Sequence, residues 1–143
     1  MDLTVRDARA SDAVDVARLL DQLGYPTDPS AVESRLERLR IVGDRVVVAE
    51  LDSNVVGLAH LQVAPAIERD RPAAKIGALV VDESRRGRGV GRALVEEMVA
   101  EASARSCEVI FLTTAERRAD AHAFYERVGL AQTGRRYART LSE

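Results

Sequence analysis

The chain has 143 residues with 21 basic and 23 acidic side chains, so its formal net charge is −2. This length predicts one domain, residues 1–143, and the charge balance argues against nucleic acid as a partner. No apolar segment approaches the ~20 residues of a membrane span, so no membrane partner is expected. A lone cysteine, Cys107, rules out an internal disulfide framework, and no Cys/His spacing indicates a metal site. The N-terminus lacks the apolar core of a signal peptide, and we therefore expect a cytoplasmic protein.

The first half of the chain predicts a strand, two helices and a β-hairpin. Residues 3–8 alternate as a strand does, and Ser11 is the expected N-cap of a helix that ends at Gly24. A second helix is expected over residues 30–40. The β-rich segments 44–51 and 55–63 are joined by Asp-Ser-Asn, which is typical of a hairpin turn.

The second half predicts alternating strands and helices. A strand over residues 75–81 is followed by a glycine-rich loop and an amphipathic helix. Residues 107–114 predict a strand buried on both faces, with Cys107 as a small buried residue at its start. A helix over residues 119–128 is capped by Gly129, and short strand-like pieces follow. The order is β-α-α-β-β-β-α-β-α-β-β, which indicates an α/β protein with a mixed sheet.

The loop after the strand at 75–81 is the most informative segment. Glycines at 87, 89 and 91 let the backbone approach a ligand without a Cβ in the way. The first N–H groups of the following helix have no partners within the helix and lie at the positive end of its dipole. Arginines add positive charge at positions 85, 86, 88 and 92. The segment therefore predicts a phosphate-binding loop.

Two common phosphate-binding motifs do not fit this loop. A P-loop requires a lysine after its last glycine, but the only lysine of the chain is Lys75, upstream of the loop. A dinucleotide-binding fingerprint requires Gly-x-Gly-x-x-Gly, and Arg92 stands where the third glycine would fall. A solvated arginine loop, or a patch for nucleic acid, is the simpler alternative. Acidic flanking residues and the absence of interleaved aromatic residues argue against nucleic acid.

The pattern that does fit is Arg-x-x-Gly-x-Gly, from Arg86 to Gly91, which resembles the pyrophosphate-binding motif of the GCN5-related N-acetyltransferase (GNAT) family. Residues 79–82 look like the central strand of that family, and residues 120–130 look like its second signature, with Tyr125. The order of elements is similar over nearly the whole chain. The resemblance implies acetyl-CoA as the acetyl donor. It implies coenzyme binding by Leu79, Val80, Val81, Arg86, Gly87, Arg88, Gly89, Val90, Gly91 and Arg92.

Acetyl transfer to an amine requires little chemical machinery. The amine must lose a proton, a backbone N–H can stabilise the oxyanion, and a hydroxyl can protonate the departing thiolate. The family resemblance assigns that last role to Tyr125. The helical spacing of Tyr125 from Ala121 and Val128 is equally typical of a core tyrosine.

Two positions depart from the family pattern. Many relatives have a glutamate in the central strand where this chain has Gly77, and an asparagine that holds the pantetheine corresponds to Arg118. The base is therefore open between bulk water, Glu50 and His60. For His60 the alternative is a strand histidine with satisfied hydrogen bonds. His122 is expected at the surface or at the edge of the coenzyme.

The leading hypothesis is an N-acetyltransferase that acts on a primary amine of a small molecule, a peptide or a protein. A noncatalytic acyl-CoA-binding module or sensor is the alternative on the same fold, and a nucleic-acid-binding regulator is disfavoured by the charge balance. The resemblance places the acceptor near the first two helices and the late strands, around residues 23–28 and 134–137. The sequence leaves open whether the chain forms a homodimer.

Overall fold

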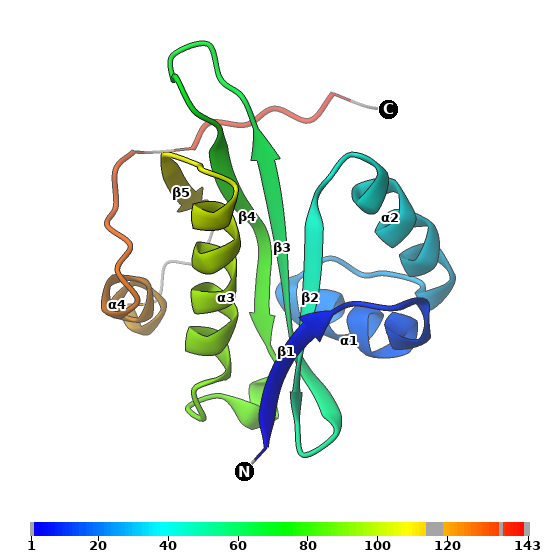
Figure 1. The fold of residues 1–143 in the computed structure, drawn as a ribbon. Helices are drawn as coiled ribbons and strands as arrows, with labels where there is room; N and C mark the ends of the chain where they lie inside the picture. The colour runs from blue at the N-terminus through cyan, green and yellow to red at the C-terminus, as the bar shows by residue number, and fades with distance from the viewer. Residues whose placement is uncertain (1, 114–118, 135, 142–143) are drawn as a thin grey trace. The chain divides into compact units, whose positions relative to one another are not determined.

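One five-stranded sheet forms the centre of the first compact unit of the chain, residues 1–112. Its strands are β1 (Leu3–Asp7), β2 (Arg45–Leu51), β3 (Asn54–Ala64), β4 (Ala73–Val81) and β5 (Val109–Leu112), side by side in chain order (Figure 1). β1 to β4 pair antiparallel, whereas β5 is parallel to β4. This mixed sheet confirms the predicted α/β class. The structure, a computed structural model, describes residues 2–113, 119–134 and 136–141.

The predicted hairpin between β2 and β3 forms, with a turn one residue shorter than predicted because Asn54 already belongs to β3. Leu51 and Asn54 are paired, so the loop contains two residues, Asp52 and Ser53. Their φ angles are +52° and +69°. Two consecutive residues with positive φ make a turn whose twist matches that of the flanking strands, and aspartate tolerates this backbone better than most residues. The hairpin therefore fixes the register of β3 against β2. On its other side, β3 pairs with β4.

Helices cover both faces of the sheet. The helices α1 (Ala13–Leu23) and α2 (Pro29–Ile41) lie on one face, and α3 (Val90–Ala104) lies on the other (Figure 1). α1 ends at Gly24, whose φ of +108° allows its N–H to bond back to the last turn. α2 begins at Pro29 after Asp28, which accepts a bond from the N–H of Ser30. The predicted ends of these two helices are thus confirmed within a residue or two.

Each layer of helices has its own apolar core against the sheet. The core on the face of α3 contains Val47, Ala49, Leu51, Val56, Ala59, Leu61, Ala74, Ile76, Val90, Leu94, Met98 and Ala102. The core on the face of α1 and α2 contains Val16, Ala17, Leu19, Val32, Val48, Val55, Leu58 and Val80. Neighbouring residues of β2 and β3 divide between the two cores because side chains alternate along a strand.

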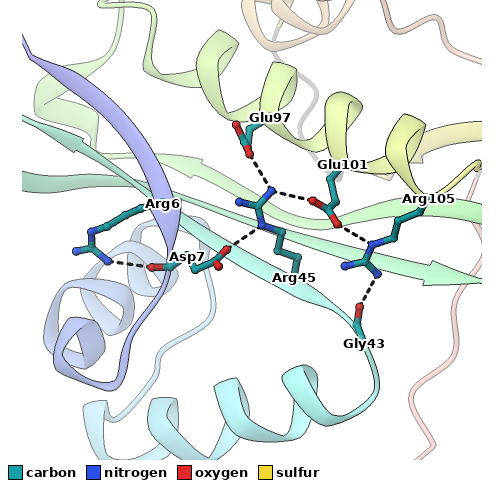
Figure 2. A network of polar contacts seen from close by, with 7 residues as sticks. All are labelled: Arg6, Asp7, Gly43, Arg45, Glu97, Glu101 and Arg105. Atoms are coloured by element: carbon teal, nitrogen blue, oxygen red, sulfur yellow. Dashed lines mark hydrogen bonds and ion pairs between the residues drawn. The ribbon is translucent and has the colours of Figure 1, made fainter.

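A polar network fixes α3 against β1 and β2 (Figure 2). The guanidinium of Arg45 donates to Asp7 at 2.8 Å, to Glu97 at 2.8 Å and to Glu101 at 3.1 Å. Arg105 donates to the same Glu101 at 2.7 Å. These ion pairs attach the polar side of the second half of α3 to the sheet, while the apolar side of the helix packs on it. The position of the first turn of α3 is therefore fixed.

The start of α1 differs from the prediction. Ser11 is not the N-cap, because Ala10–Asp12 form a separate 3-10 turn and α1 begins at Ala13. The side chain of Asp12 is 6% exposed and accepts two bonds from Arg6, each 2.9 Å long. It also accepts the N–H of Arg9 at 2.8 Å. A half-buried ion pair with a residue of β1, 6 residues away, thus sets the start of the helix.

The last strand of the sheet is shorter and more exposed than predicted. β5 has four residues, and Phe111 is 40% exposed, so the strand is not buried on both faces. Cys107 is half-buried and precedes the strand, because its N–H caps α3 by bonding to the carbonyl of Ala102. The prediction missed this turn because an apolar run alone does not mark where a helix cap ends. Thr114, the predicted last residue, lies outside the described residues.

The second unit, residues 113–143, contains the helix α4 (Ala119–Arg127). Gly129 has a φ of +92°, and Leu130 bonds back to Tyr125, which is the expected glycine cap. The expected last two strands do not occur among the described residues 130–134 and 136–141. This segment is exposed and rich in arginine, so it has little apolar surface with which to pair as a strand in this unit. Among the helices described, none has the length and apolarity needed to cross a membrane.

Replacing Asp12 with asparagine should lower the free energy of unfolding by about 1–3 kcal/mol at pH 7, the range for hydrogen bonds to charged groups. The hydrogen bonds from Arg6 outweigh burial and hold the pKa of Asp12 below its usual value. A lowered pKa stabilises the fold above the unfolded-state pKa, and this contribution is lost as the pH falls through the folded-state pKa. The difference between wild type and Asp12→Asn should therefore be constant near neutrality and shrink below about pH 4. Urea unfolding at several pH values measures it, with the more exposed Asp15→Asn as the control.

Candidate active site

β4 has one edge that is only partly paired. β3 pairs with β4 from Ala73 to Val81, whereas β5 pairs with it only from Ala73 to Ile76. Among the described residues, no strand pairs with the remaining part of that edge, Gly77–Val81. An open strand edge presents N–H and C=O groups that can bond to an extended ligand with amide groups. The predicted coenzyme-binding residues Leu79, Val80 and Val81 belong to this open segment.

The open segment of β4 leads directly into the glycine-rich loop. Gly87 and Gly89 both have a φ of +82°, which favours glycine, and α3 begins at Val90. The first bond within the helix runs from the N–H of Ala93 to the carbonyl of Gly89. The N–H groups of the two residues at the start of the helix, 90 and 91, thus precede the first helical bond and are available to a ligand. A Cβ built at either loop glycine meets nothing within 4 Å, so the space above the loop is open.

The predicted loop residues have two different roles in this geometry. The side chain of Val90 is 1% exposed and belongs to the core, so only its backbone can serve a ligand. Arg86 and Arg88 are exposed and make no ion pair within the described part of the chain. Arg92 is exposed and lies 3.7 Å from Glu96. The loop therefore combines backbone N–H groups with two accessible guanidinium groups, which is what a phosphate ester requires.

Helix α1 holds the corner at which β4 becomes the loop. Arg18 donates to the carboxylate of Asp82 and, at 2.9 Å, to the carbonyl of Val55. Gln22 accepts the N–H of Glu83 at 3.0 Å. Burial disfavours the charged form of Asp82, but the bonds it accepts from Ser84 and from Arg18 hold its pKa below the usual value. This tether is not apparent in the sequence, because its partners lie 61 and 64 residues apart.

A histidine of β3 lies against an irregular point of β4. His60 pairs with Ala78 and Leu61 pairs with Ile76, so Gly77 is an extra residue that forms a bulge. A Cβ on Gly77 would lie 2.8 Å from Nδ1 of His60, which only glycine avoids. The other ring nitrogen, Nε2, lies 2.8 Å from Oδ2 of Asp44. His60 and Gly77 were predicted as separate features, whereas their contact and the hydrogen bond to Asp44 were not predicted.

The other residues named from the sequence lie elsewhere. Glu50 accepts a bond from Arg6 at 2.7 Å and pairs with Val55, at the opposite end of β2 from the residue that faces His60, Val46. Tyr125 belongs to α4 in the second unit, is half-buried, and makes an edge contact with the ring of Phe124 at 5.7 Å.

The role of Tyr125 as proton donor stays a prediction. His122 is an exposed residue of α4, and Arg118 lies outside the described residues. Within the described part of the chain, no group of three or more acidic, cysteine or histidine residues could hold a metal ion.

Comparison with known proteins gives a consistent result. The model of the acetyltransferase (GNAT) family matches residues 14–130, from α1 to the cap of α4. A glucosamine 6-phosphate N-acetyltransferase from Trypanosoma brucei brucei is 27% identical over 136 residues, 90% of each chain.

Solved structures show the same fold. The crystal structure of a Trypanosoma brucei acetyltransferase is 28% identical, with a TM-score of 0.85 over 98% of this chain and 100% of that one. An aminoglycoside N-acetyltransferase in complex with CoA has a TM-score of 0.83 over 98% of this chain and 95% of its own, at 17% identity. That last likeness concerns the fold alone.

Replacing Arg18 with methionine should lower the free energy of unfolding by about 1–3 kcal/mol, because Asp82 loses a charged hydrogen-bond partner while the packing of the side-chain stem is retained. Arg40→Met is the matched control, since Arg40 pairs with Glu37 across an exposed helix surface, where ion pairs contribute little to stability. Urea unfolding measures both variants. Equal, small effects would show that the tether does not stabilise the corner.

Proposed function

Because the chain belongs to the acetyltransferase (GNAT) family, we propose that it transfers the acetyl group of acetyl-CoA directly to a primary amine. The observation that carries this proposal is the continuity of the open edge of β4 with the glycine-rich loop at the start of α3. One extended ligand with amide groups at one end and a pyrophosphate at the other suits both parts. Acetyl-CoA is such a molecule.

In this proposal the coenzyme follows the chain from β4 to α3. The backbone of Leu79, Val80 and Val81 pairs with the pantetheine arm, and the N–H groups of the loop and of the first turn of α3 bind the pyrophosphate. Arg86 and Arg88 are free to contact phosphate oxygens. A neighbour solved with CoA has the same fold, which supports this use of the site.

The chemistry proceeds without a covalent intermediate on the protein. The amine loses a proton and its nitrogen attacks the thioester carbonyl, which forms the N–C bond. A backbone N–H at the bulge of β4 stabilises the oxyanion. The carbonyl then re-forms as the C–S bond breaks, and the thiolate takes a proton from Tyr125, which regains one from solvent. The products are the N-acetylated amine and free coenzyme A.

The acceptor we propose to test first is a phosphorylated amino sugar, because the curated relative is a glucosamine 6-phosphate N-acetyltransferase. A peptide or protein amine is the broader alternative. A noncatalytic acyl-CoA-binding module is the second candidate function. It is favoured by one observation, namely that Gly77 has no side chain at the position where many relatives have a glutamate.

The decisive experiment is thiol release from acetyl-CoA with a panel of amines. The panel contains glucosamine 6-phosphate, glucosamine, an aminoglycoside and a peptide with a free N-terminus, with buffer alone as the control. We expect thiol release that depends on one class of amine and matches the amount of amide formed. Coenzyme binding without amine-dependent release from any of them would favour the noncatalytic module.

The variant Gly89→Asp should weaken the binding of CoA by at least about 10-fold, or 1.4 kcal/mol, because it places a carboxylate where the pyrophosphate binds. Gly24→Asp is the matched control. Its φ of +108° gives a comparable backbone cost, about 1–2 kcal/mol, but it lies at the end of α1. Calorimetric titration of CoA into both folded variants measures the difference. Equal affinities would contradict the position of the phosphate site.

The variant Tyr125→Phe should lower kcat by about 10²–10⁴-fold, because it removes the proposed proton donor and retains the ring. Its affinity for CoA and its thermal stability should stay close to those of the wild type. Steady-state kinetics with the acceptor found in the panel provides the measurement. A kcat near the wild-type value, with the chemical step shown to limit the rate, would leave Tyr125 as a packing residue.

A further inference from the structure

The imidazole of His60 fills the space that a side chain at position 77 would need. A Cβ on Gly77 would be 2.8 Å from Nδ1 and 3.3 Å from Cε1 of the ring. No side chain at that position can therefore coexist with the ring where it lies. The family pattern suggested that this chain lacks a proton-accepting group here, whereas the structure brings one in from the neighbouring strand, β3.

The imidazole ring of His60 also lies beside the point at which β4 ceases to pair with β5. The last residue of β4 that pairs with β5 is Ile76, and the next residue, Gly77, is exposed. His60 is 22% exposed at its side chain, so it is held in place and can still be reached. Its pairing partners in the sheet are Val46 and Ala78. Val46 packs against the core under α1 and α2, so the ring belongs to that face of the sheet.

The hydrogen bond to Asp44 determines which nitrogen can accept a proton. Asp44 has a side chain that is 5% exposed, and its Oδ2 lies 2.8 Å from Nε2. A carboxylate accepts but does not donate, so the neutral ring carries its proton on Nε2. The lone pair is then on Nδ1, the nitrogen that faces the bulge at Gly77. This tautomer is assigned from the hydrogen bond.

Other charged groups lie on the same side of the sheet as His60. From α2, Glu33, Glu37 and Arg40 line the same surface depression as Asp44. On β4, Lys75 pairs with Gln62 on the face of the sheet that carries His60. The hydrogen-bonded partner of the ring in the described structure is Asp44.

We propose that His60 is the catalytic base and that Asp44 positions it, an inference that rests on the proposed function. Nδ1 takes a proton from the acceptor amine, so the N–H bond breaks as the N–C bond to the acetyl carbon forms. Asp44 holds the ring and stabilises the imidazolium, which returns its proton to solvent after the product leaves. The thiolate receives its proton from a separate donor.

The test compares His60→Gln with the wild type over a range of pH, with the acceptor identified in the amine panel. We expect kcat/KM to fall by about 10²–10⁴-fold. The decrease of kcat/KM at low pH that comes from protonation of an enzyme group, rather than of the amine, should disappear. The affinity for CoA, measured by calorimetry, should not change. The matched control is Glu50→Gln, which removes the rival carboxylate bound to Arg6 and should keep the wild-type profile.

Two further variants decide the outcome if His60→Gln does not fold. Gly77→Ala puts a Cβ against Nδ1 and should lower kcat while CoA still binds. Asp44→Asn should lower kcat, and long-range ¹⁵N NMR of the ring should show the loss of the single Nε2–H tautomer. A merely structural role for Asp44 would not change that tautomer in the folded variant.

The two levels of the proposal fail in different ways. If the wild type releases thiol with an amine and the His60→Gln profile matches it, only the role of His60 is overturned. If His60→Gln is unfolded and Gly77→Ala and Asp44→Asn both have wild-type kcat, the role of His60 is also overturned. If the wild type binds CoA but acts on no amine of the panel, the proposed function and this inference fall together.

Discussion

The site depends on one asymmetry in the hydrogen bonding of β4. One edge is paired with β3 over the whole strand, which gives β4 a fixed position, and the other edge loses its partner after Ile76. Without the full pairing on the first side, an unpaired edge would fray, and without the gap on the second side, no ligand backbone could be added to the sheet. The bulge at Gly77 lies at the transition between these two conditions.

The same rigidity continues into the loop through contacts that are not part of the sheet. Arg18 and Gln22 of α1 fix Asp82 and Glu83, and the Arg45 network holds the second half of α3. The glycine loop is therefore anchored at its start and followed by a helix that is fixed along its length. N–H groups preorganised in this manner bind an anion without first paying the entropy of ordering the loop.

The sequence predicted the parts of this fold that depend on local patterns. The glycine cap at Gly24 and the hairpin turn at Asp52 and Ser53 are properties of a few adjacent residues, and both were found where expected. The buried pair of Arg6 and Asp12 was not predicted, because a polar residue near a helix start is ordinarily read as a cap. The contact of His60 with Asp44 was not predicted either, since the register of β2 against β3 brings the two residues together.

The close approach of His60 to Gly77 has a consequence for how this sequence can change over time. A side chain at position 77 and a histidine at position 60 compete for the same volume, so neither site can mutate as though the other were absent. On this backbone, a histidine ring in its present position requires glycine at position 77, and a side chain at position 77 requires that ring to move or position 60 to be smaller. Substitutions at these two positions, which are 17 residues apart in the sequence, should therefore be correlated.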